Sequence, residues 1–232
     1  MTLPIAGPRA ALCPSLFFAC GVAFAQAGGS VALLSDYRYR GMSLSQEKPT
    51  GRLSAAYDDP GGWFAGASLA QVMLYRPRWQ VQLLGYAGYA GRLSERFGWE
   101  AGATAVHFGA DSRYDYREAF AGLSGERWNA RLHYSPDYFG SGARTGYGEV
   151  NVGLPLSPLV RVTGHAGALV RVGATPVEGG RTSLDGSLGL AVARDAWEAQ
   201  IAWVAGGRSA VYPTAYGRAS QAALVLSASL SF

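Results

Sequence analysis

The sequence predicts an all-β fold, namely an antiparallel transmembrane β-barrel of about twelve strands with short periplasmic turns. Three observations support this prediction. Apolar side chains recur at every second position through most of the chain, and the connections between them are alternately short and long. Charged residues make up only 16% of the chain, while glycine is frequent at 32 residues. The mean hydropathy of +0.05 fits strands that show apolar groups to lipid and polar groups to a lumen.

The final segment shows the alternation most clearly. From Ala222 to Phe232 every even position is Ala, Leu or Phe, and positions 227, 229 and 231 are serine. Because successive side chains of a strand point to opposite faces, one face is apolar and the other hydroxylated. Phe232 resembles the terminal aromatic residue that marks many bacterial outer-membrane proteins. We therefore expect Phe232 to be recognised by the barrel-assembly machinery.

The same period recurs upstream and predicts twelve strands, an even number as in bacterial single-chain barrels. Trp197, Ile201 and Trp203 share a face opposite Glu198 and Gln200, for example. The predicted strands cover residues 30–40, 51–58, 62–71, 79–91, 97–108, 115–124, 127–136, 144–154, 158–171, 182–193, 196–206 and 218–232.

The predicted connections provide an independent test of the barrel. Those after even-numbered strands are tight, such as Asp59-Pro60-Gly61 and Arg194-Asp195. Those after odd-numbered strands are longer and cover residues 41–50, 72–78, 109–114, 137–143, 172–181 and 207–217. Short periplasmic turns and longer outer loops are typical of barrels, whereas a soluble β-sandwich gives no reason for this alternation.

Tryptophans gather beside these turns. In a barrel they would form girdles at the water–lipid boundary, and in a sandwich they would be core residues. Their regular positions favour girdles. These tryptophans are Trp63, Trp79, Trp99, Trp128 and Trp197.

The N-terminus predicts export. An apolar run over residues 10–25 follows Arg9 and ends in small residues, which is the layout of a secretory signal peptide cleaved after Ala25 or Ala27. We assign residues 1–27 to this peptide and 28–232 to the barrel. In an alternative interpretation Cys20 becomes a lipid-modified first residue. Both cysteines, Cys13 and Cys20, lie in the leader, so a cysteine-ligated metal or cysteine nucleophile is excluded from the exported part.

One segment resembles a known family. Residues 35–46, SDYRYRGMSLSQ, and residues 61–66, GGWFAG, are similar to the opening motifs of the TorF-type porins, a proteobacterial outer-membrane family. The likeness is specific over residues 30–70 and topological beyond them. It implies a Gram-negative outer-membrane location and a pore, without a defined solute.

Basic residues suggest what such a pore would favour. Arg38 and Arg40 share one face of their predicted strand, and Arg131 and Arg161 fall on lumen faces. A charged side chain facing lipid costs about 2–4 kcal/mol at mid-membrane, so we expect these arginines in the lumen. Rings of arginine favour anions. The sequence thus predicts passive diffusion of small hydrophilic solutes with a preference for anions.

The candidate pore-lining residues include acidic and histidine side chains as well. They are Arg38, Arg40, Arg131, His133, Glu149, Arg161, His165, Asp185 and Glu198. In an alternative, the arginines pair with acidic residues and fill the interior, as happens in small barrels. The acidic residues considered for this pairing are Glu100, Glu118, Glu149, Asp185 and Glu198.

Other functions have weaker support. His133-Tyr134-Ser135 has the His–Ser spacing of outer-membrane phospholipase A, but that site opens toward lipid, and here Leu132 and Tyr134 occupy the lipid face. We expect no enzyme, no catalytic residue, no metal site and no cofactor. A non-conducting structural or interaction barrel stays possible, although short outer loops leave little material to fill the lumen. The scattered basic residues do not favour nucleic acid, so outer-membrane lipid and small solutes are the expected partners.

Overall fold

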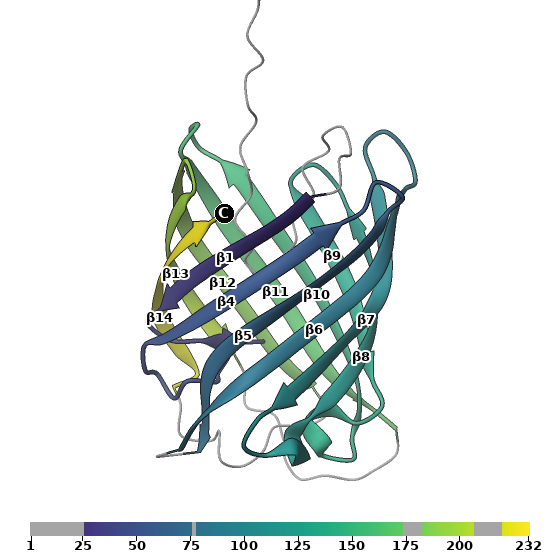
Figure 1. The fold of residues 1–232 in the computed structure, drawn as a ribbon, viewed down its shortest axis with the longest axis vertical. Coiled ribbons are helices and arrows are strands. Elements are labelled where there is room, and N and C mark those ends of the chain that lie inside the picture. Colours follow the sequence, from purple (N-terminus) through teal and green to yellow (C-terminus); the bar gives the residue numbers. More distant parts are fainter. Residues whose placement is uncertain (1–25, 76–77, 174–181, 207–219) are drawn as a thin grey trace, which may run out of the picture.

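Twelve antiparallel strands form one closed barrel, as predicted. The computed structural model in Figure 1 describes residues 26–75, 78–173, 182–206 and 220–232. The barrel strands are β1 (Gln26–Leu34), β4 (Thr50–Asp58), β5 (Trp63–Tyr75), β6 (Arg78–Arg92), β7 (Gly98–Phe108), β8 (Tyr116–Ser124), β9 (Trp128–Ser135), β10 (Arg144–Pro155), β11 (Val160–Val172), β12 (Thr182–Arg194), β13 (Trp197–Gly206) and β14 (Ala222–Ser231). Between them lie the short strands β2 (Arg38–Tyr39) and β3 (Met42–Ser43) and the 3-10 helices η1 (Ser112–Tyr114) and η2 (Tyr138–Gly140).

The first and last strands close the barrel. β1 pairs with β4 on one side and with β14 on the other, so that Ser30 lies opposite both Ser54 and Ser231. Gly29 and Phe232 also exchange two backbone hydrogen bonds of 2.8 and 2.9 Å. Every strand edge is therefore paired, which removes the open backbone groups that lipid cannot satisfy.

The alternation of side chains is confirmed. Leu132 is 71% exposed on the outer face of β9, whereas Arg131 beside it is 9% exposed and points inward. On β12, Leu184 and Leu188 are exposed outside and Asp185 lies on the inner side. Because one strand residue in two faces lipid, the barrel exterior is apolar and its interior polar.

Short turns and aromatic side chains mark one end of the barrel. Residues 59–62, 93–97, 125–127, 156–159 and 195–196 connect the strands at the end that carries the C-terminus (Figure 1). Around this end, Trp63 packs edge-on against Tyr89 at 5.3 Å, Tyr89 lies 5.9 Å from Trp99, and Phe97 lies 6.2 Å from Trp128. Short turns and an aromatic girdle are typical of the periplasmic end of outer-membrane barrels, and the opposite end is here called the outer end.

Several predicted boundaries differ from the structure, and two of the differences change the interior of the barrel. The predicted loop 72–78 is mostly strand, because β5 extends to Tyr75 and β6 begins at Arg78. Alternation is absent there because Val72, Met73 and Leu74 are all buried, and the pairing shifts register between Val72 and Tyr75. The predicted strand 30–40 ends at Leu34, and the chain then turns into the lumen.

Of the predicted signal peptide, residues 1–27, only Gln26 and Ala27 are among the described residues. Gln26 and Ala27 lie in β1 opposite Asp58 and Tyr57, so strand pairing begins just before the predicted barrel start at residue 28. Most of the predicted outer loops 172–181 and 207–217 also lie outside the described residues. Within the described ranges, no helix is long and apolar enough to cross a membrane.

Candidate functional site

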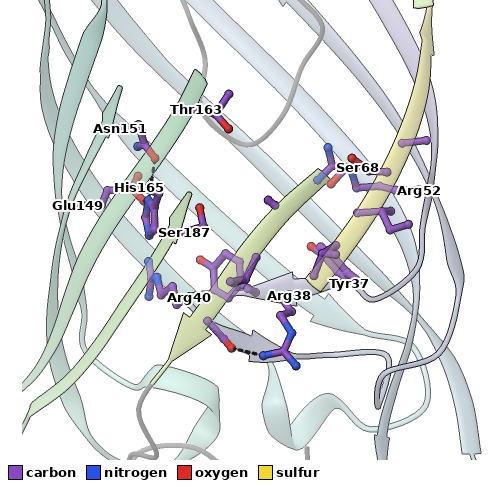
Figure 2. Close-up of a pocket in the computed structure, with 18 of the residues that line it drawn as sticks. Tyr37, Arg38, Arg40, Arg52, Ser68, Glu149, Asn151, Thr163, His165 and Ser187 are labelled. Atoms are coloured by element: carbon purple, nitrogen blue, oxygen red, sulfur yellow. Dashed lines mark hydrogen bonds and ion pairs between the residues drawn. The ribbon is translucent and has the colours of Figure 1, made fainter. Parts of the chain in front are cut away.

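Residues 35–49, here called the lumen hairpin, fold from the end of β1 into the barrel. Strands β2 and β3 form its two arms, with Tyr39 opposite Met42. The side chains of Leu44, Ser43 and Ser45 are completely buried, and Arg40 is only 9% exposed. Figure 2 shows this hairpin lying across the lumen, with Arg38 and Arg40 beside a cavity inside the barrel. The segment between the first two barrel strands is thus an internal element and not a surface loop.

The tip of the lumen hairpin depends on a two-residue turn. Arg40 and Gly41 both have positive φ angles, 49° and 74°. Hairpins with two-residue turns of this kind favour glycine, which adopts positive φ without strain. A Cβ added to Gly41 would lie 2.6 Å from the Cα of Gly206 and 2.8 Å from the Cβ of Asp185. Glycine therefore allows the tip to touch the walls formed by β12 and β13.

Asp36 holds the two arms of the hairpin together. Its carboxylate accepts hydrogen bonds from the hydroxyls of Ser43 (2.5 Å) and Ser45 (3.0 Å) and from the Arg38 guanidinium (2.7 Å). Asp36 is 4% exposed. These charge-assisted bonds offset the cost of burying its carboxylate and stabilise the fold of the hairpin.

The strongest anchor of the hairpin to the wall is Arg40. Its guanidinium donates two hydrogen bonds, of 2.8 and 2.7 Å, to the two carboxylate oxygens of Glu118 on β8. It also lies 4.0 Å above the ring of Tyr147 on β10. Burial alone lowers the pKa of Arg40, but the Glu118 carboxylate raises it well above its ordinary value, so the side chain stays charged. Because two parallel hydrogen bonds join the guanidinium to the carboxylate, this pair fixes the orientation of Arg40 as well as stabilising its contact with β8.

Further contacts extend across the barrel. The backbone N–H of Met73 on β5 donates to the Leu44 carbonyl (2.7 Å), and the Tyr37 hydroxyl donates to Gln82 on β6 (3.1 Å). The backbone N–H of Ser35 donates to Leu226 on β14 (2.8 Å). The lumen hairpin is therefore attached to opposite sides of the barrel.

An apolar cluster packs around the hairpin near the outer end of the lumen. Side chains of the hairpin, the wall and η2 contribute to it, including a stack of Tyr116 on Phe139 at 4.8 Å. The buried members are Tyr37, Leu44, Ala70, Val72, Leu74, Val106, Phe108, Tyr116, Tyr138, Phe139, Ala143, Tyr147 and Leu169. This cluster corrects the expectation that short outer loops leave little material to fill the lumen.

The remaining lumen contains a cavity of about 360 Å³, and its two walls differ. One wall is rich in small side chains, such as Ser54, Ser68, Ser227 and Ser229, and Arg52 is its charged residue. The opposite wall carries most of the charged groups, including Glu149, Arg161 and Asp185. Figure 2 shows Ser68 on one side of the cavity and Glu149 and His165 on the other.

The charged wall is made of bonded pairs. Arg131 donates to Glu100 (2.5 and 3.0 Å), and Arg161 donates to Glu198 (2.5 Å). His165 bonds to Asp185 (2.7 Å).

His133 lies between two carboxylates, with ring nitrogens 3.7 Å from Glu118 and 3.5 Å from Glu149. Both nitrogens are buried, and among the described residues these two contacts with carboxylates, which are longer than hydrogen bonds, are their polar contacts. His133 thus links the anchor of the lumen hairpin to the charged wall.

The sequence was compared with protein families and with curated proteins. Residues 21–231 match a bacterial family described as "Bacterial protein of unknown function (Gcw_chp)". The chain belongs to this family. No curated protein matches the Gcw_chp chain by sequence.

Solved structures similar to the Gcw_chp chain include two small porins. The NanC porin matches with a TM-score of 0.59 and 12% identity over 89% of this chain and 99% of that one. The KdgM porin, solved in complex with disordered oligogalacturonate, matches with a TM-score of 0.53 and 11% identity over 89% and 99% of the two chains. At these identities the likeness shows the fold alone, a closed antiparallel barrel like that of outer-membrane porins.

All the predicted pore-lining residues of the Gcw_chp chain border the cavity. They are Arg38, Arg40, Arg131, His133, Glu149, Arg161, His165, Asp185 and Glu198. Arg38 and Arg40 reach it from the lumen hairpin and not from a strand, which corrects their predicted position.

Sequence reasoning missed Asp36, Tyr37 and Tyr147 as site residues of the Gcw_chp chain. Tyr147 shares the alternation of Glu149 and Asn151 and could have been found from it. Asp36 and Tyr37 carried no signal, because an inward fold of their segment was not expected.

The His133–Ser135 pair of the Gcw_chp chain does not form a catalytic arrangement. The Ser135 hydroxyl donates to the backbone carbonyl of Arg117 (2.8 Å), and His133 faces Glu118 and Glu149. A nucleophilic serine needs a base within hydrogen-bond reach. In the described part of the chain, no group of three or more His, Cys, Asp or Glu residues is arranged to hold a metal ion.

Proposed function

We propose that this protein is an outer-membrane channel of low conductance for passive diffusion of small hydrophilic solutes, and that the lumen hairpin forms its narrowest section. The observation that carries the proposal is a cavity bordered by charged side chains and enclosed by a barrel with an apolar exterior. The fold shared with the NanC and KdgM porins supports it. The resemblance of residues 35–46 to TorF-type porins agrees with this function.

The charges of the cavity favour weak ion selectivity. Five arginines and five carboxylates border it among the described residues. Arg38, Arg40, Arg131 and Arg161 each lie 2.5–2.7 Å from a carboxylate. Paired arginines present less net positive field to a passing anion than free ones. The preference for anions stays a prediction, and we expect it to be small.

Export and assembly are part of the same proposal. The leader is cleaved near Ala25, and the barrel inserts into the outer membrane with Phe232 as its assembly signal. The ring of Phe232 is 75% exposed on the outer face, where such a signal is accessible. Cell fractionation tests this part, because a periplasmic, detergent-free product contradicts it.

The experiment for conduction is recording in planar bilayers, together with liposome swelling by sugars of increasing size. Oligogalacturonate is a useful acidic probe, because the KdgM porin was solved in complex with it. Discrete current steps of the wild-type protein support the channel. The reversal potential in a salt gradient measures the preference for anions.

A non-conducting barrel is the second candidate, and the hairpin that crosses the lumen favours it. A variant with residues 36–47 replaced by a short Gly-Ser linker separates the two functions. If neither the wild type nor this variant conducts although both are folded, the barrel is structural. If the variant conducts strongly and the wild type weakly, the hairpin restricts a true channel.

A further inference from the structure

Two arginines lie close together on the outer face, near the end of the barrel opposite to the short turns. Ala119 on β8 lies opposite Tyr134 on β9, and two residues from Ala119 the Arg117 carbonyl accepts a hydrogen bond from the Ser135 hydroxyl, so Arg117 lies beside the end of β9. On the other side of β9, Thr145 lies opposite Ser135, so the preceding residue Arg144 also lies beside the end of β9. Since neighbouring strands are about 4.8 Å apart and β9 lies between the two arginines, their Cα atoms are about 10 Å apart across the sheet. We call Arg117, Tyr134 and Arg144 the rim patch.

The charge of the rim patch is not compensated by the described chain. The side chains of Arg117 and Arg144 are exposed, and neither makes a hydrogen bond or an ion pair with another described residue. Acidic groups at the same end are engaged elsewhere. Asp111 binds Arg113, Asp115 binds His107, and Asp137 accepts from the backbone of Gly142.

The two ends of the barrel differ in this respect. At the periplasmic turns, Arg127 lies 3.7 Å from Glu126 and Arg194 lies 3.9 Å from Asp195. In each of these turns an acidic residue is next to the arginine and offsets its charge. The excess positive charge of the rim patch is thus a property of the outer end.

The rim patch begins where the lipid-facing band ends. On β9 the exposed side chains run outward from Leu132 (71%) to Tyr134 (45%), and the arginines flank the next outward position. An aromatic ring followed by basic side chains is the order expected across a lipid interface, from acyl chains to charged head groups. The partner suited to this order is anionic and lies at head-group depth.

We propose that the rim patch binds the phosphate groups of a phosphorylated glycolipid in the outer leaflet. Arginine is suited to this role because its planar fork donates paired hydrogen bonds to phosphate oxygens. Arg117 and Arg144 approach one phosphate, or two phosphates of one head group, from either side, and Tyr134 packs against the sugar or acyl boundary. The inference rests on the proposed outer-membrane location and is independent of conduction.

The test uses purified full-length barrel in detergent, with bis-phosphorylated lipid A and its dephosphorylated form as probes in native mass spectrometry. The Arg117→Gln/Arg144→Gln variant is compared with Arg127→Gln/Arg194→Gln, which removes two exposed arginines from the periplasmic end. We expect the rim variant to lose binding of the phosphorylated lipid by about tenfold or more. The control variant keeps its binding of the phosphorylated lipid, and the dephosphorylated lipid binds to neither variant.

Equal binding by the rim variant, or equal binding of the dephosphorylated lipid, overturns the proposal. Shifted mobility of the unheated barrel in gels shows that each variant is folded, so loss of binding is not loss of structure. Because the lipid is supplied in detergent, a failure of the outer-membrane location shows separately in cell fractionation.

Discussion

Replacement of Arg40 by methionine is expected to release the lumen hairpin and raise conductance. Arg40 donates two hydrogen bonds to Glu118, whose side chain is 2% exposed. Removing one partner of a buried pair costs about 3–5 kcal/mol, because the other charge stays buried and uncompensated. His133, 3.7 Å from the same carboxylate, offsets part of this cost. A cost of about 3 kcal/mol multiplies the population of displaced hairpins about 100-fold.

Single-channel recording measures this change. The wild-type barrel is expected to show small, infrequent current steps, and Arg40→Met to show larger or far more frequent ones. The double variant Arg40→Met/Glu118→Leu removes both charges, and replacement of a buried pair by apolar residues is often neutral. It should therefore return toward wild-type conductance, which gives a double-mutant cycle for the pair.

A matched control separates hairpin release from a change of lumen charge. Arg161→Met also removes a paired lumen arginine, but Arg161 contacts Glu198 and not the hairpin. It should alter ion selectivity slightly without a large increase in conductance. If Arg40→Met and Arg161→Met behave alike, or if Arg40→Met conducts like the wild type while folded, the assignment of Arg40 as the anchor is refuted.

Three other predictions concern the tip, the lipid face and the terminus. Gly41→Ala should displace the hairpin tip and increase conductance, because the added Cβ would lie 2.6 Å from the backbone of β13. Gly142→Ala is the control, because Gly142 has a φ of +69° but open space around it. That variant should cost only the backbone strain of about 1–2 kcal/mol and leave conductance unchanged. Leu132→Arg should lower the free energy of unfolding in lipid vesicles by about 2–4 kcal/mol, measured by urea titration, whereas Leu156→Arg in a periplasmic turn should cost about 0–1 kcal/mol. Phe232→Ala should reduce the amount of barrel in the outer membrane of cells while the purified variant still refolds in detergent; equal cellular levels would contradict its role in assembly.

The barrel could be predicted because its signal is local. Side-chain alternation follows from the geometry of a strand, and lipid penalises any charged group on the outer face. Leu184, Leu188 and Asp185 therefore show their orientation in the sequence itself. The same rule placed every candidate charged residue toward the lumen, although it did not show how those residues pair.

The lumen hairpin could not be predicted in this way. The alternation of Tyr37, Arg38, Tyr39 and Arg40 is that of a strand, so the local pattern continued the predicted first strand beyond Leu34. Its inward position depends on Glu118 and Gln82, which lie 78 and 45 residues from their partners in the hairpin. No local pattern reports contacts at that separation.

The sequence by itself determined the strands, their lipid-facing sides and the even number that allows closure, because each depends on neighbouring residues and on the period of two. Only the tertiary structure decided that the lumen hairpin fills part of the lumen and that Arg38, Arg40, Arg131 and Arg161 pair with carboxylates. The physical reason is that these features arise when distant strands meet around a closed interior. A buried charge there must find a partner across space and not along the chain.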